Sequence, residues 1–98
     1  MSTYIMTFNY TQQGMEKIKK SPDRVEDAKE TIQALGGEVK AFYGVLGAEY
    51  DTIFILEAPD DEAVAKMALA IGSHGSVRTS THRAFSGEEF KRIISGLP

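Results

Sequence analysis

The fold of this chain is decided by one stretch, Gly47 to Glu62, which reads GAEYDTIFILEAPDDE. A glycine suited to a turn leads into a nearly continuous strand over residues 50–57, whose apolar centre, Ile53 to Leu56, is the pattern of a strand buried on both faces. Pro59 cannot continue the hydrogen bonding of a strand, and Asp60 or Asp61 can cap a helix that follows. The stretch therefore predicts a turn, a central strand and a helix start with almost no connecting residues.

Three further strands are expected around this one. Residues 3–11 alternate along the chain and are rich in aromatic and β-branched side chains, as in a well-formed strand. Residues 38–46 and 77–85 also suit strands, but they carry more polar side chains. Polar strands are typical of sheet edges, so the runs 3–11 and 50–57 are expected at the centre.

Three helices connect or follow these strands, with a polar connection over residues 12–20. Ser21 is the expected cap of the first helix, Pro22 suits its first turn, and Gly36-Gly37 ends it. Apolar stripes at helical spacing define the first two helices: Val25, Ala28, Ile32 and Leu35, then Val64, Met67, Ala68 and Ile71 before Gly72. Ser86 and Glu89 form a capping box, with Phe85 and Phe90 as its staple, for a last helix to about Ile94.

The order of elements, β-α-β-β-α-β with an extra C-terminal helix, predicts an α+β fold. Two right-handed split β-α-β units give the ferredoxin-like antiparallel sheet with spatial order 4-1-3-2. Helices cover only one face of such a sheet, whereas the strands at 3–11 and 50–57 carry large apolar side chains on both faces. An uncovered apolar face on a monomer is unusual, so a homodimer or higher oligomer is expected.

Composition limits the class of protein. The chain has 98 residues with 42% hydrophobic and 26% charged, as expected for a single domain over residues 1–98. It has no cysteine, no pattern of a signal peptide and no apolar run near the ~20 residues that cross a bilayer, so a cytoplasmic protein without membrane contact is expected. The net charge of −3 argues against nucleic-acid binding. Two histidines without metal-ligand spacing predict no metal site, and no cofactor motif is found.

Several segments together resemble the GYD domain family, which is named for a Gly-x-Tyr-Asp element. The matching residues are Ser21 to Arg24, Leu35 to Tyr43, Tyr50-Asp51, Glu57 to Glu62, Gly72 to Thr79 and Arg83 to Ser86. In this chain Ala48 and Glu49 both separate Gly47 from Tyr50, one residue more than in the usual element. The resemblance implies a dimeric α+β barrel of the ferredoxin-like type and implies no general activity.

The expected topology gathers mixed polar chemistry at one edge of the sheet, where the first strand ends and the third and fourth begin. This edge holds the candidate catalytic residues Tyr50, Asp51 and His74 and the candidate ligand-binding residues Asn9, Tyr10 and Arg78. The opposite edge, with Glu57, Asp60, His82 and Arg83, lacks this mixture. A cleft at the Asn9/Tyr50/His74 edge could admit a small anionic or phenolic ligand, assisted by free N–H groups at a helix N-terminus.

Two interpretations of these residues stay open at this point. Asp51 could act as a base beside Tyr50, or could orient His74. Alternatively, Asp51 caps its turn or pairs with Arg78, and Tyr50 packs across the strand pair. The sequence thus favours a protein that binds a small organic molecule, with or without acid–base chemistry. The alternative is a non-catalytic interaction module whose motif residues serve fold and oligomerisation.

Overall fold

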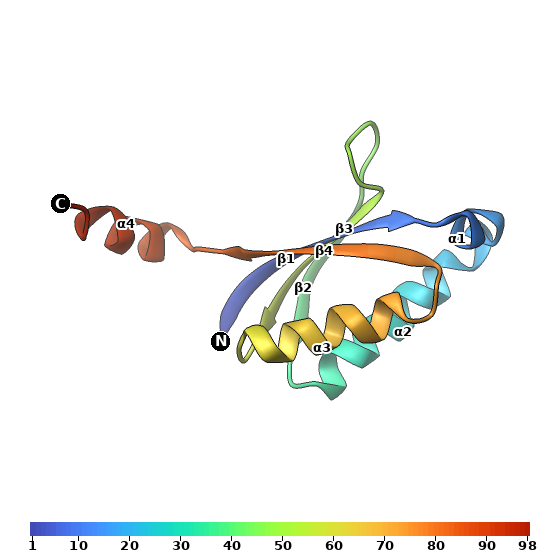
Figure 1. Cartoon of the computed structure of the whole chain (residues 1–98), viewed down its shortest axis with the longest axis horizontal. Helices are drawn as coiled ribbons and strands as arrows, with labels where there is room; N and C mark the ends of the chain where they lie inside the picture. Colours follow the sequence, from blue (N-terminus) through green and yellow to red (C-terminus); the bar gives the residue numbers. More distant parts are fainter.

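In the computed structural model, which describes residues 1–98, a four-stranded antiparallel sheet carries two long helices on one face (Figure 1). The strands are β1 (Ser2–Tyr10), β2 (Glu38–Gly44), β3 (Thr52–Ala58) and β4 (Val77–Ala84). Their spatial order is β2-β3-β1-β4. This order confirms the predicted ferredoxin-like sheet, with the two most apolar strands at its centre.

Side chains alternate between the two faces of the central strands. Tyr4, Met6 and Phe8 of β1 are buried on the face that the helices cover, where they meet Phe54 and Leu56 of β3. The opposite face, which we call the open face, carries the register pairs Ile5–Ile55 and Thr7–Ile53. The three isoleucines there are only half-buried. Apolar side chains therefore lie on both faces, as predicted, and the core occupies only one of them.

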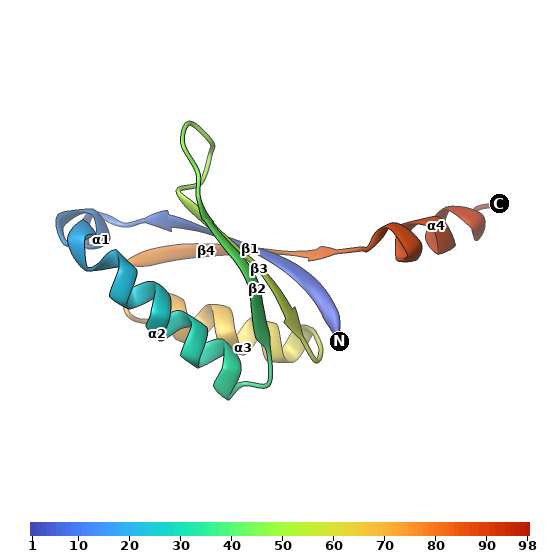
Figure 2. The ribbon, with the colours of Figure 1, turned by 180° about the vertical axis from the view of Figure 1, so that it is seen from behind.

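The two helices that cover the core are α2 (Ser21–Ala34) and α3 (Asp61–Gly72), seen from behind in Figure 2. Asp60 caps α3, because its Oδ1 accepts a hydrogen bond from the Ala63 N–H at 2.8 Å. The prediction for α2 is wrong by one residue: Lys20 occupies the cap position and Ser21 is already helical. The Ser21 hydroxyl instead shares a hydrogen bond with the Tyr10 hydroxyl at 2.7 Å.

The connection before α2 is more regular than predicted. It contains a short helix, α1 (Gln12–Glu16), and a single 3₁₀ turn, η1 (Ile18–Lys20). The Thr11 hydroxyl caps α1 by accepting from the Gly14 N–H at 3.1 Å. Gly14 is buried against the turn before β4, where any Cβ would collide with the Ser76 carbonyl oxygen. Only glycine fits at this close approach of two backbones.

The β2–β3 connection projects from the sheet as a loop (Figure 1). β2 ends at Gly44 and β3 begins at Thr52, so both strands are slightly shorter than predicted. Tyr50 and Asp51 consequently belong to this loop rather than to the strand.

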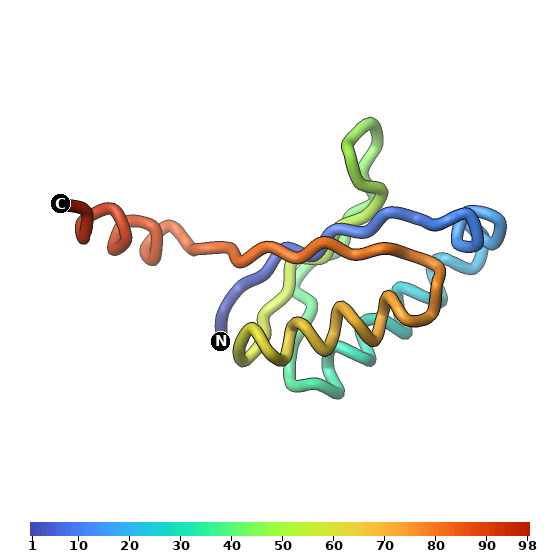
Figure 3. The backbone as a smooth tube through the Cα atoms, in the orientation of Figure 1, coloured from blue at the N-terminus to red at the C-terminus, as the bar shows by residue number.

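The last helix, α4 (Gly87–Ser95), points away from the rest of the molecule along its longest dimension (Figure 3). The predicted capping box is confirmed, since the side chains of Ser86 and Glu89 each accept from the other's backbone N–H at 3.1 and 2.9 Å. Phe85 and Phe90, the expected staple, are both more than half exposed. No helix of the chain has the length and apolar character needed to cross a membrane.

Candidate functional site

A pocket of about 480 Å³ lies between α2 and the helix-covered face of the sheet. Its apolar floor consists of three phenylalanines from three different strands, Phe8, Phe42 and Phe54. Phe54 packs edge-on against the other two rings, with centroid distances of 5.0 Å to Phe8 and 5.6 Å to Phe42. This edge-to-face arrangement is favourable for aromatic rings.

The pocket exists because α2 buries only part of its predicted apolar stripe. Ile32 is fully buried, whereas Val25 and Ala28, one to two turns earlier, are half-buried and line the pocket. The small side chain of Ala28 does not fill the space above the phenylalanine floor. The N-terminal half of α2 is therefore a pocket wall rather than a core element.

The polar part of the wall comes from the start of α2. The Arg24 guanidinium donates from Nη1 to the hydroxyl of Ser76, a buried residue of the turn before β4. The N-terminus of α2 adds few free donors, because the Ser21 N–H donates to the Ile18 carbonyl oxygen and Pro22 has no N–H. Lys20, Asp23, Asp27 and His74 are exposed side chains of the same lining. The pocket thus combines an apolar floor with charged groups of both signs.

Two of the six predicted site residues line this pocket. Tyr10 contributes through its bond with Ser21, and His74 lies in the turn after α3. Asn9 and Arg78 are cross-strand partners in the β1–β4 register, on the open face, and neither lines the pocket. The Asn9 side chain donates to the Glu49 carbonyl oxygen at 2.8 Å.

Asp51 is held by backbone partners. Its Oδ2 accepts from the Tyr10 N–H at 2.9 Å, its N–H donates to the Phe8 carbonyl at 2.8 Å, and its carbonyl accepts from the Val45 N–H at 2.9 Å. These bonds join the end of β1 to both sides of the β2–β3 loop. They match the interpretation that Asp51 stabilises its turn. Tyr50 is half-exposed and does not line the pocket.

Sequence reasoning missed the residues that dominate the pocket, above all Arg24 and Phe42. A signal for the floor was available, because Phe8 and Phe54 share a face of the two central strands. No sequence signal marks Arg24, since its position depends on how α2 lies over the sheet.

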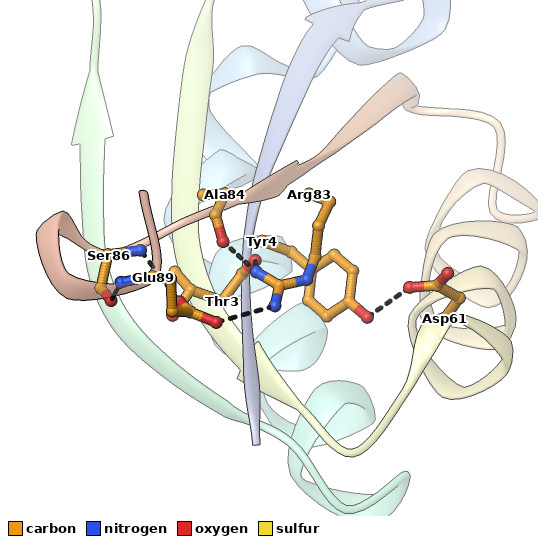
Figure 4. Close-up of polar contacts among 7 residues, drawn as sticks. All are labelled: Thr3, Tyr4, Asp61, Arg83, Ala84, Ser86 and Glu89. Carbon is orange, nitrogen blue, oxygen red and sulfur yellow. Dashed lines mark hydrogen bonds and ion pairs between the residues drawn. The ribbon is translucent and has the colours of Figure 1, made fainter. Parts of the chain in front are cut away.

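A second polar cluster lies at the opposite edge, around Arg83 (Figure 4). The Tyr4 hydroxyl donates to Asp61 Oδ1 at 2.6 Å, and Arg83 lies over the Tyr4 ring at 5.7 Å from its centroid. Burial raises the pKa of Tyr4 above its ordinary value of 10.0, and the hydrogen bond to Asp61 adds to this. Arg83 also reaches Glu89 at 3.2 Å. The backbone N–H of Ser86 and then Arg83 hold the pKa of Glu89 below its ordinary range.

Fold and pocket together define a small ferredoxin-like α+β domain with one helix-covered face. The family model for the GYD domain matches residues 4–94, and the chain belongs to this family. A relative in Thermus thermophilus, the glutamine synthetase and cystathionine beta-lyase binding protein, is 36% identical over 85 residues, which are 86% of this chain and 88% of the relative.

Solved structures confirm the fold. The leucine response regulatory protein of Mycobacterium tuberculosis superposes with a TM-score of 0.56 over 87% of this chain at 15% identity. A feast or famine regulatory protein of M. tuberculosis, complexed with L-methionine, gives 0.57 over 88% at 15% identity. The chain spans about half the length of these structures, 51% in each case.

Proposed function

We propose that this protein binds a small organic molecule in the pocket between α2 and the sheet, with an apolar body on the phenylalanine floor and an acidic group at Arg24. The observation that carries this proposal is the pocket itself. Its volume of about 480 Å³ lies within the ~300–1,000 Å³ typical of ligand sites, and its lining sets polar and charged side chains around an apolar floor.

Arg24 is the group best suited to bind the acidic end of such a molecule. The guanidinium carries five N–H donors in a planar fork, and the single Ser76 hydroxyl uses only part of them. A carboxylate matches this fork. Asp23 and Asp27 belong to the same lining, so a ligand with an amine beside its acidic group also fits.

Acid–base chemistry in this pocket would depend on His74. It is the one residue of the Tyr50, Asp51 and His74 set that lines the pocket, and it is exposed there. The proposed function is therefore binding, with His74 as the residue to replace if turnover of a bound molecule is found.

The proposal is tested by isothermal titration calorimetry with phenylacetate, phenethylamine and L-phenylalanine as probes. We expect phenylacetate or L-phenylalanine to bind and phenethylamine to bind more weakly. Arg24→Gln should weaken phenylacetate binding by roughly 10-fold or more, since a charge-assisted hydrogen bond contributes about 1.5–3 kcal/mol.

Lys29→Gln is the matched control, because Lys29 lies on the same helix, pairs with Glu26 at 3.4 Å and does not line the pocket. If none of the three probes binds, or if both variants weaken binding equally, the assignment of this pocket and of Arg24 is wrong.

Binding of another protein is a second candidate function. The Thermus relative is named for binding two enzymes, glutamine synthetase and cystathionine β-lyase, and it matches nearly the whole chain. A pull-down of each purified enzyme on the immobilised protein tests this candidate. Binding that survives Arg24→Gln would support docking outside the pocket, whereas no retention of either enzyme would count against it.

The open face offers a surface through which the protein can self-associate. Ile5, Ile53 and Ile55 form its centre, and Tyr43 beside them is 59% exposed. We infer that this face packs on a second copy, because a broad apolar face is seldom left in water. Sedimentation velocity of Ile53→Lys should show a smaller species than the unmodified chain. A monomeric unmodified chain would contradict the inference.

A further inference from the structure

The helix α4 presents an apolar stripe that nothing in its own chain covers. Phe90, Ile93 and Ile94 share one face of α4, with exposed fractions of 57%, 42% and 49%. Leu97, just after the C-cap Gly96, continues the exposed apolar surface and is 62% exposed. Phe85, at the root of the helix, is 52% exposed. We refer to residues 85–97 as the arm. Its charged and small polar residues lie on the remaining faces, as in a helix that packs against a partner surface.

The arm depends on such a partner for its stability. Isolated helices shorter than about 12–15 residues are marginal in water, and α4 has nine residues. Its capping box helps, and the ion pair between Arg83 and Glu89 ties its first turn to β4. All three views show that α4 points away from its own sheet and helices (Figures 1–3). Its own domain therefore cannot cover the stripe.

A matching concave surface lies on the body of the molecule. A groove of about 310 Å³ runs between α3 and the edge strand β4, lined by Val64, Ala65 and Ala68 on one side and by Thr81 and Arg83 on the other. The alanines allow close approach of a helix, as small residues generally do at helix contacts. The groove lies on the helix-covered side, so it is independent of the open face.

We propose that the arm of each copy docks in the α3–β4 groove of a second copy, in a reciprocal exchange. The groove reaches Arg83, and the arm of the same chain leaves the domain directly beyond this residue. A two-fold axis near Phe85 therefore brings each arm to the start of the other groove. Such an isologous contact closes after two copies.

The area of the stripe supports exchange over one-sided docking. The five exposed apolar side chains present roughly 400–500 Å² to water, from their exposed fractions and typical side-chain areas. If the surface of α3 and β4 around the groove loses as much area as the stripe, docking one arm buries about 900 Å² and exchange of two arms about 1,800 Å². Stable interfaces bury about 1,200–2,000 Å². Only the reciprocal arrangement reaches this range.

Charges at the margins are compatible with this docking. Lys91 borders the stripe and forms no ion pair in its own chain, and Glu62 at the start of α3 likewise forms none. Asp61, which lines the groove, is the neighbour of Glu62. The groove can therefore accept Lys91 at its Asp61 and Glu62 end, while Arg83 in the same lining is already paired with Glu89.

Site-specific disulfide crosslinking tests the proposal cleanly, because the chain has no cysteine of its own. One preparation carries Ile94→Cys and a second carries Ala68→Cys; they are mixed and oxidised mildly. We expect covalent heterodimers in high yield. Adding Phe90→Asp to the Ile94→Cys protein should lower this yield by roughly 10-fold or more, as loss of a central aromatic contact does in other interfaces.

The matched control is Ser95→Cys, on the polar side of the same helix, mixed with Ala68→Cys. Equal crosslinking from positions 94 and 95 would indicate random collision and would overturn the proposal. Absence of crosslinking from position 94 would also overturn the proposal. This outcome is expected if the arm binds a different protein. Circular dichroism of each variant confirms that the domain is folded.

Discussion

Replacement of Tyr4 by phenylalanine isolates the contribution of one buried hydroxyl. Tyr4 is 2% exposed, and its hydroxyl donates to Asp61 at 2.6 Å (Figure 4). Tyr4→Phe keeps the ring and its packing under Arg83 and removes only this hydrogen bond. Hydrogen bonds to charged groups contribute about 1.5–3 kcal/mol net. Asp61 is exposed, so water replaces the lost donor, and we expect a cost of about 1–1.5 kcal/mol.

The assay is urea unfolding at neutral pH, followed by circular dichroism, together with thermal melting. For a domain of this size the expected loss lowers the melting temperature by roughly 5–10 °C. Tyr43→Phe is the matched control, because Tyr43 is 59% exposed and its hydroxyl has no hydrogen-bond partner in the chain. Its unfolding free energy should change by no more than about 0.5 kcal/mol.

A second readout comes from alkaline pH. Burial raises the pKa of Tyr4 in the folded state above its ordinary value of 10.0. The free energy of unfolding therefore keeps the full contribution of neutral Tyr4 below pH 10, and this contribution is lost as the pH rises through the raised pKa of Tyr4. The unmodified chain should lose this increment above pH 10, and Tyr4→Phe should not. If Tyr4→Phe unfolds like Tyr43→Phe, or if both chains decline equally at high pH, the reasoning fails.

Three further substitutions test the core and the turns by urea unfolding. Phe54→Ala removes the 1%-exposed ring at the centre of the aromatic floor and should cost about 3–5 kcal/mol; a loss below about 1 kcal/mol would contradict its place in the core. Asp51→Ala should lower the free energy of unfolding by about 1–2 kcal/mol, because the Tyr10 N–H loses its acceptor. Asp51→Asn keeps an acceptor oxygen and should lower it less. Gly14→Ala should cost about 1–3 kcal/mol because its Cβ meets a backbone carbonyl, whereas Gly44→Ala, in open space, should cost less than about 1 kcal/mol.

The fold could be predicted because its signals are local and repeated. Alternation in β1, the apolar run of β3 and the Asp60 cap each specify an element without knowledge of the rest of the chain. Order and handedness rules then leave one arrangement of the four strands. Two kinds of error remain. The short helix α1 and the turn η1 were expected only as a polar connection. Element ends differ where a tertiary contact decides, since Ser21 bonds to Tyr10 across the pocket and does not cap α2.

The candidate site was harder to predict, because it depends on which side of the sheet each residue faces. Asn9 and Tyr10 are neighbours in the sequence, yet β1 sends their side chains to opposite faces, and only Tyr10 reaches the pocket. The pocket volume depends on the separation between α2 and the sheet. An apolar stripe such as Val25 and Ala28 indicates which face of the helix points toward the sheet. It does not indicate how closely the helix packs on the sheet.

The hydrogen bonds around Asp51 determine where residues can be inserted in this chain. They close the β2–β3 loop at its base, from Val45 to Asp51, and fasten that base to the end of β1. The strand register on either side is set by these bonds, and the tip of the loop is tied back to β1 through Asn9 and the Glu49 carbonyl oxygen. Lengthening a closed loop by one residue costs only a few tenths of a kcal/mol. The additional residue between Gly47 and Tyr50 is accommodated in this projecting tip. The same tip is therefore a place where evolution, or an engineer inserting a peptide, can add sequence without disturbing the sheet.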